Sequence, residues 1–163
     1  MIFRPLNEKG LTLTEVTIVA AIGTLVLLGM GGFYLQSQAT WLDGSAQSLT
    51  QREVTLVTQA IVDSVRVAHQ AQVTASPDAT HHDVALAKAS AGGLPFYHFW
   101  WSATDSLVHG GTSPGAADDH AMMQSPVDKF VVAVNGGMVR VSLRARAATG
   151  QFVEFSGSAR MRN

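Results

Sequence analysis

Few residues of this chain are of types that could do chemistry, and they are widely spaced. The 163 residues include no cysteine, which excludes disulfides, thiolate nucleophiles and cysteine-based zinc sites. His81, His82 and Asp83 stand together, and two aspartates precede a histidine at 118–120. Neither group has further ligands at the spacing of a zinc or calcium site. We interpret residues 81–83 as a solvated loop and do not expect calcium at 118–120. We therefore expect no metal, no cofactor and no enzymatic activity.

One carboxylate, that of Glu15, lies where charge is costly. Residues 16–42 contain no Asp, Glu, Lys or Arg, and residues 16–35 form a nearly continuous apolar run. About 20 such residues suffice for a helix to cross the hydrocarbon layer of a membrane. An acidic residue costs about 2.5–3.5 kcal/mol at the centre of such a helix and less near its end. Glu15 therefore either reaches the headgroups or pairs with a cationic group, and its position alone leaves both open.

The flanks of the apolar run predict its orientation. Arg4 and Lys9 precede it, which by the positive-inside rule keeps the first residues in the cytoplasm. An ordinary secretory signal peptide cleaved after residues 37–39 is one alternative, but the apolar run exceeds the usual centre of about 7–15 residues. An uncleaved signal anchor is another. Both alternatives leave Glu15 without a role.

Residues 9–23, which read KGLTLTEVTIVAAIG, resemble the cleavage and methylation motif of the type IV pilin-like family. In that motif a short charged leader ends in glycine, glutamate stands at the fifth mature position, and a long apolar helix follows. The resemblance implies cleavage between Gly10 and Leu11 by a prepilin peptidase and N-methylation of Leu11. It also implies that Glu15 serves filament assembly by meeting the N-terminal amine of a neighbouring subunit.

Two features depart from the motif. Leu11 replaces the commoner phenylalanine, and Thr14 and Thr17 stand where apolar residues are usual. Neither change touches Gly10 or Glu15. The proposed pairing is physically reasonable, because an ammonium and a carboxylate buried together avoid a penalty of several kcal/mol that each would pay alone.

The function that the resemblance implies is that of a structural subunit, of the minor type, in a type IV pilus or a type II secretion pseudopilus. Its partners would be the prepilin peptidase, other pilin or pseudopilin subunits packed helix against helix, an inner-membrane assembly platform and membrane lipid. The chain would cross the inner membrane once, with the leader cytoplasmic and the head periplasmic, before it enters the filament.

Two other functions stay open. One is a filament-tip receptor pilin that binds DNA or a surface, for which a basic face of Arg140, Arg144, Arg146 and Arg162 is the supporting feature. We favour a solvated face or a subunit contact, since acidic residues occur elsewhere and no aromatic residues interleave with these arginines. The other is a signal-anchored periplasmic protein of a different class.

The elements that must position these residues follow from the hydrophobic pattern. We expect a leader at 1–10, a transmembrane or filament-core helix at 11–36, and a head at 37–163. The helix should continue as an amphipathic half over about 45–73 and break near 73–77. The apolar stripe of that half is predicted to pack on a sheet; it consists of Leu49, Leu56, Val57, Ala60, Ile61, Val65 and Ala68.

The β-region is expected over about 95–163. Residues 96–101 predict a strand, residues 83–89 a short helix within a linker-like segment, and residues 110–126 a loop. Near the C-terminus, Asn135-Gly136 separates two alternating segments and predicts a hairpin with a primed turn. A third alternating segment over 153–162 completes a three-stranded antiparallel meander. The predicted fold class is therefore α+β, with a long N-terminal helix packed on a small C-terminal antiparallel sheet, as in pilins.

Overall fold

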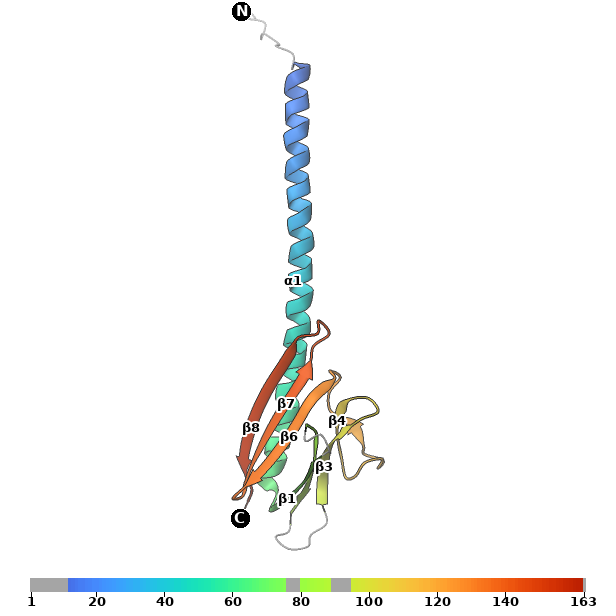
Figure 1. Cartoon of the computed structure of the whole chain (residues 1–163), viewed down its shortest axis with the longest axis vertical. Coiled ribbons are helices and arrows are strands. Elements are labelled where there is room, and N and C mark those ends of the chain that lie inside the picture. The colour runs from blue at the N-terminus through green and yellow to red at the C-terminus, as the bar shows by residue number, and fades with distance from the viewer. Residues whose placement is uncertain (1–11, 76–79, 89–94, 163) are drawn as a thin grey trace, which may run out of the picture. The chain divides into compact units, whose positions relative to one another are not determined.

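The computed structural model describes residues 12–75, 80–88 and 95–162 and confirms the α+β class. A single long helix near the N-terminus, α1 (Leu13–Val67), precedes a set of antiparallel strands (Figure 1). The chain divides into two compact units, Met1–Leu42 and Asp43–Asn163, which are described separately below. The strands are β1 (Gln70–Ala75), β2 (His82–Ala87), β3 (Pro95–Ser102), β4 (Leu107–Gly111), β5 (His120–Ala121), β6 (Val127–Asn135), β7 (Met138–Arg146) and β8 (Phe152–Arg160).

The C-terminal meander forms as predicted. β6, β7 and β8 pair in sequence order as a three-stranded antiparallel sheet. The alternation of β7 places Val139, Val141 and Leu143 on the buried face. The connection between β6 and β7 lies one residue later than predicted: Asn135 pairs with Met138, and the two turn residues are glycines with φ of 56° and 81°. A primed two-residue turn requires positive φ at both positions, which explains this choice of residues.

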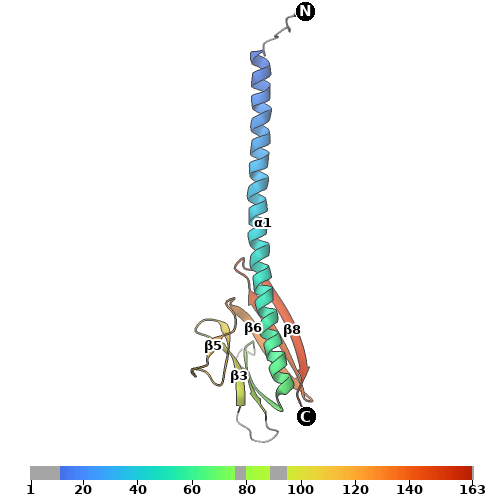
Figure 2. The ribbon, with the colours of Figure 1, turned by 180° about the vertical axis from the view of Figure 1, so that it is seen from behind.

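The segment of α1 in the head covers one face of this sheet, as the two opposite views show (Figures 1 and 2). Its buried residues fall at helical spacing and include Val54, Val57, Ile61 and Val65. They join the inner residues of the sheet in one hydrophobic core. At the centre of the contact, Gly157 of β8 lies so close to α1 that an added Cβ would stand 2.9 Å from the Thr58 Cγ2 atom.

A second antiparallel sheet, not predicted from the sequence, is formed by β1 to β5 in sequence order. Val84, Leu86, Phe99 and Val108 point from it into the same core. Backbone hydrogen bonds tie it to the meander, since the Phe130 N–H donates to the Thr80 carbonyl over 2.9 Å. The head therefore has one core between a helix and two sheets.

Three local expectations are wrong. The helix ends at Val67 rather than near 73, because the backbone that follows is recruited by tertiary partners: the His69 N–H donates to the Ala87 carbonyl, and the Arg162 N–H donates to the Ala68 carbonyl. The short helix expected at 83–89 is largely strand β2, which pairs with β1 and β3. The segment 74–94, which we read as linker-like, thus contains β2 and the last two residues of β1.

The predicted helical stripe also needs correction at two positions. Leu49 is 63% exposed and Leu56 is 59% exposed, so both lie away from the core. Thr50 and Thr58 are buried in the helix surface that packs on the sheets. The buried Thr50 hydroxyl lies within hydrogen-bond distance of two oxygens: the Ala46 carbonyl oxygen at 3.2 Å and the Ser125 hydroxyl oxygen at 3.0 Å.

Candidate functional site

The N-terminal end of α1 is closed by a reciprocal pair of hydrogen bonds between Thr12 and Glu15. The Thr12 N–H donates to Glu15 Oε2 over 2.8 Å, and the Glu15 N–H donates to Thr12 Oγ1 over 3.3 Å. This is a capping box, which satisfies two of the amide groups that a helix start leaves without partners. The Thr12 hydroxyl also donates to Oε2 over 3.0 Å. Both hydrogen bonds to this carboxylate thus use Oε2, and Oε1 has no hydrogen bond within the described residues.

The capping box is a function of Glu15 that our sequence analysis missed. The signal was present, since a threonine followed three residues later by a glutamate, just before an apolar run, is the pattern of a capping box. Gly10 and Leu11, the predicted cleavage and methylation positions, lie outside the described residues. The predicted pairing of Glu15 with a neighbour's amine therefore stays a prediction.

No element within the described residues covers the apolar part of α1. Every residue over 12–42 is exposed, including Leu13 at 86% and Phe33 at 76%. By length and composition the helix is able to cross a membrane. An isolated helix that is hydrophobic all round needs lipid or other helices about it, because exposed patches of this size are rare on soluble monomers.

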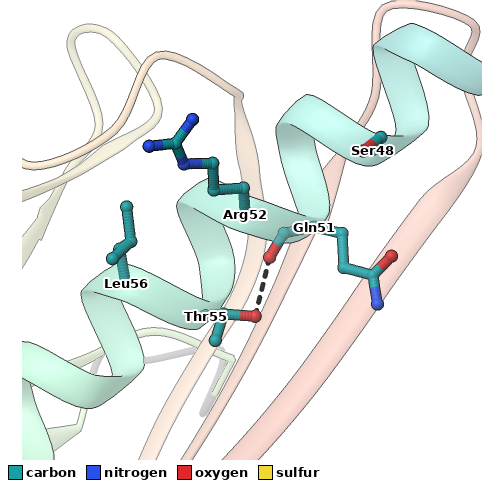
Figure 3. Close-up of a pocket in the computed structure, with 5 residues that line it drawn as sticks. All are labelled: Ser48, Gln51, Arg52, Thr55 and Leu56. Carbon is teal, nitrogen blue, oxygen red and sulfur yellow. Dashed lines mark hydrogen bonds between the residues drawn. The ribbon is translucent and has the colours of Figure 1, made fainter.

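A second exposed surface lies on α1 within the head (Figure 3). Ser48, Gln51, Arg52, Thr55 and Leu56 line a shallow depression of about 320 Å³ on it. The Thr55 hydroxyl donates a hydrogen bond to the Gln51 carbonyl of its own helix over 2.8 Å. With Leu49 nearby, this surface combines two exposed leucines with one arginine, which is the composition of a contact surface rather than of a catalytic site.

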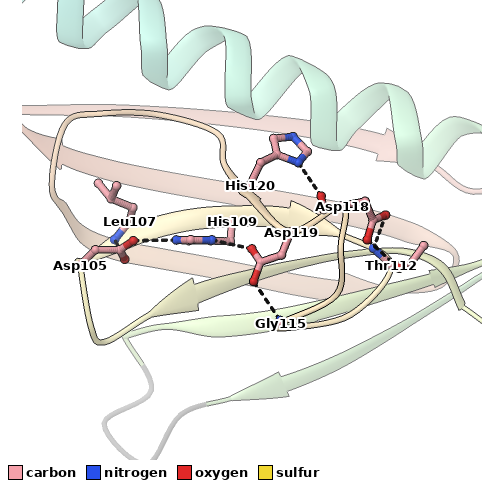
Figure 4. A network of polar contacts seen from close by, with 8 residues as sticks. All are labelled: Asp105, Leu107, His109, Thr112, Gly115, Asp118, Asp119 and His120. Atoms are coloured by element: carbon pink, nitrogen blue, oxygen red, sulfur yellow. Dashed lines mark hydrogen bonds and ion pairs between the residues drawn. The ribbon is translucent and has the colours of Figure 1, made fainter.

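The β3–β4 turn and the segment that follows β4 carry a polar network centred on His109 (Figure 4). Its Nε2 atom lies 2.8 Å from Asp105 Oδ2, and its Nδ1 atom lies 2.7 Å from Asp119 Oδ1. Asp119 uses its other oxygen to accept the Gly115 N–H over 2.9 Å. The His109 ring stacks on Trp100, with centroids 5.8 Å apart. These segments are thereby tied together through one imidazole.

The charges of this network shift the pKa values of its members in opposite directions. Partial burial alone would lower the pKa of His109, but hydrogen bonds to Asp119 and Asp105 and their charges outweigh it and raise the pKa above 6.5. The pKa of Asp119 is lowered below 3.8, first by the Gly115 N–H and then by His109. The pKa of Asp105 is also lowered, because its bonds to His109 and Leu107 outweigh desolvation. The charged forms are therefore favoured.

The two aspartates at 118–119, for which we did not expect a calcium site, are held in a structured loop. The Asp118 carboxylate accepts the Thr112 N–H over 2.9 Å and the Thr112 hydroxyl over 2.8 Å. His120 contacts the Asp118 carbonyl through Nδ1 over 2.8 Å. Sequence spacing does not reveal these bonds, since they depend on how the loop folds over β4. Among the described residues no cluster of three or more His, Asp or Glu side chains is arranged to hold a metal ion.

The remaining histidines and Asp83 lie on or beside the sheet of β1–β5. His82 reaches across to the meander, where its Nδ1 lies 2.7 Å from the Val132 carbonyl oxygen. Desolvation raises the pKa of Asp83, although the Trp101 N–H, His98 and His82 oppose it. Asp83 and His98 line one cleft of about 310 Å³. The adjacent residues His82 and Asp83 therefore serve different contacts.

The basic face of the meander differs from expectation in one respect. Phe152, which is 52% exposed, lies near two guanidinium groups, with Arg144 at 5.2 Å and Arg146 at 5.7 Å from its ring centre. An aromatic residue is therefore close to two of the arginines in space, although none interleaves with them in sequence. Arg144 is neutralised by Asp128, to which its Nε donates over 2.7 Å. The charge of this face is consequently smaller than the count of arginines indicates.

Comparison with known proteins adds no relative: no family model, no curated protein and no solved structure matches this chain.

Proposed function

We propose that this chain is a structural subunit, of the minor type, of a type IV pilus or type II secretion pseudopilus. In this function a prepilin peptidase removes residues 1–10, and the mature subunit passes from the inner membrane into a filament through its N-terminal helix. The observation that carries the proposal is the apolar half of α1: the residues over 12–42 are all exposed, and the apolar run begins directly after Glu15. The α+β head with its own core is consistent with a pilin-like fold.

The geometry of Glu15 supports a second role beside capping. The capping box occupies Oε2 and leaves Oε1 without a hydrogen bond in the described residues. A carboxylate in an apolar environment needs more than one partner, since an uncompensated charge costs several kcal/mol. The ammonium of a processed Leu11 in a neighbouring subunit would supply a charge-assisted partner. Capping and subunit pairing are therefore compatible.

Two substitutions separate these roles. Glu15→Gln keeps the capping box, because glutamine serves at this position as well as glutamate, but it removes the charge. Thr12→Val keeps the charge and removes the hydroxyl from the cap, at a cost of about 1 kcal/mol. We expect Glu15→Gln to lower recovery in sheared filaments by at least about tenfold, since breaking a buried ion pair costs about 3–5 kcal/mol. Thr12→Val should stay within about fivefold of wild type.

The measurement is recovery in sheared filaments at equal membrane abundance. Intact-mass analysis of each variant, isolated from the membrane fraction, must first show Leu11 as the N-terminus. A loss in Thr12→Val together with wild-type recovery of Glu15→Gln would assign Glu15 to capping alone. Wild-type recovery of Glu15→Gln would contradict the pairing, and an N-terminus near residue 40 would contradict the proposed family function as a whole.

A further inference from the structure

A single imidazole fastens the segment after β4 to the turn before it. Asp105 belongs to the β3–β4 turn, His109 to β4, and Asp119 to the residues between β4 and β5. Both ring nitrogens of His109 lie within 2.8 Å of a carboxylate oxygen. An ionised carboxylate only accepts hydrogen bonds, so both nitrogens must donate, and only the imidazolium has two N–H groups. With both carboxylates ionised, this geometry requires a charged His109.

The surroundings of the ring fit this charge state. The Trp100 ring is stacked at 28° to the imidazole, a position in which an aromatic face attracts a cation. The side chain of His109 is 16% exposed, so water competes weakly for its two bonds. Asp118 and His120 flank Asp119, while Asp83 on β2 and His98 on β3 share the sheet face of Trp100. Within the described residues none of these four bonds to His109.

A neutral His109 cannot keep both contacts. Either tautomer has one N–H and one lone pair, so one carboxylate oxygen would face a lone pair at hydrogen-bond distance. The segment over 112–119 holds its shape through Asp119 and Asp118, which accept the N–H groups of Gly115 and Thr112. Loss of the His109–Asp119 contact would free the Asp119 carboxylate to turn away from the Gly115 N–H, which weakens the attachment of this loop to β4.

We propose that His109 is a pH-dependent lock, which in its imidazolium form fixes the 112–119 loop to the β3–β4 turn and on deprotonation releases it. This goes beyond the proposed subunit function and does not depend on it. The loop supplies Pro114 to the cleft that Asp83, His98 and Trp100 line. Release of the loop therefore opens one wall of that cleft.

The pH range of the lock follows from its members. Because the pKa of His109 is raised in the folded protein, its contribution is complete below about pH 6.5 and is lost as the pH rises through the folded value. Because the pKa values of Asp105 and Asp119 are lowered, their contribution is present above about pH 3.8 and is lost as the pH falls through their folded values. The loop is thus held most firmly between about pH 4 and 6.5.

The test uses the full chain in detergent micelles. Amide hydrogen exchange at Gly115, corrected for the intrinsic pH dependence of exchange, reports the loop, and the ring nitrogens of His109 are titrated by NMR. We expect His109 to titrate above pH 6.5 and the protection of Gly115 to fall about tenfold between pH 6 and pH 9. In His109→Gln this fall should disappear, because glutamine does not titrate.

His120→Gln is the matched control. His120 lies beside Asp119 in the same segment, but its Nδ1 contacts only the Asp118 carbonyl among the described residues. This variant should keep the pH dependence of wild type. An ordinary or lowered pKa at His109, or protection of Gly115 that does not change with pH, would overturn the proposal. If His109→Gln unfolds the head, the NMR titration of the wild-type ring and the Gly115 protection of His120→Gln still decide the question.

Discussion

Gly157 shows how one residue sets the distance between α1 and the meander. A Cβ at this position would lie 2.9 Å from Thr58 Cγ2 and 3.0 Å from Val62 Cγ2. Threonine and valine are both branched at Cβ, and their side chains have few rotamers in a helix. The two methyl groups therefore cannot move aside, and the helix itself would have to shift.

We predict that Gly157→Ala destabilises the head by about 1–3 kcal/mol, the usual cost of overpacking a well-packed core. Ser156→Ala is the control, since Ser156 is exposed and lies on the other face of the same strand. Urea unfolding of both variants in the same detergent measures the difference. Equal stability of Gly157→Ala and wild type would mean that the helix contact is looser than described.

The residues of the polar network illustrate what a sequence conceals at this scale. His109 and its two carboxylates come from three segments, and only the folding of the loop over β4 brings them together. Their spacing matches no motif, because the bonds are made across a turn and a loop. By contrast, the cap of Thr12 and Glu15 is local, and the pattern of residue types suffices to predict it.

At the scale of elements, the prediction succeeded where the pattern was local and strong. β7 alternates apolar and basic residues, and a glycine-containing turn precedes it, so the meander could be predicted. β1 and β2 contain alanine, glutamine, histidine and aspartate and carry little β-propensity. Their structure comes from pairing with β3, which sequence analysis of each segment alone does not detect. Leu49 and Leu56 were wrongly assigned to the buried stripe, because this helix carries apolar residues on its exposed surface as well as on its buried one.

The turn between β6 and β7 offers a test of the observed register. Gly136 has a φ of 56°, and no atom lies within 4 Å of a Cβ built there, so backbone strain alone decides the outcome. We predict that Gly136→Val lowers the free energy of unfolding by about 1–2 kcal/mol, the cost of a left-handed conformation. Gly136→Asn should cost far less, because asparagine tolerates this region. Thermal unfolding followed by circular dichroism compares them, and equal effects would contradict a primed turn.

At the scale of the whole molecule, the boundary between the two compact units separates two kinds of surface. All residues over 12–42 are exposed, whereas the head buries its apolar side chains in one core. Trp41 is 76% exposed and Leu42 is 62% exposed, so both belong with the apolar segment by character. The sequence pattern placed the start of the head at 37, because the composition changes gradually across these residues.

We predict that residues 43–163 fold without the apolar segment and remain soluble without detergent, because this unit contains the whole core. Circular dichroism should show a β-rich spectrum and cooperative urea unfolding. The matched comparison is a segment starting at 37, which retains Trp41 and Leu42 and should associate more readily in size-exclusion chromatography. Aggregation of the 43–163 segment, or unfolding without cooperativity, would show that its stability depends on residues before 43.

The packing of β8 on α1 has a consequence for the order of events during synthesis. Ala159 of β8 belongs to the same core as Val54 and Ile61 of the helix, so residues from opposite ends of the head must meet before that core closes. Contacts so distant in sequence slow folding, because the chain between them must be ordered first. A nascent chain that lacks residues 152–160 leaves this helix surface uncovered. The head therefore completes its folding only after β8 has emerged.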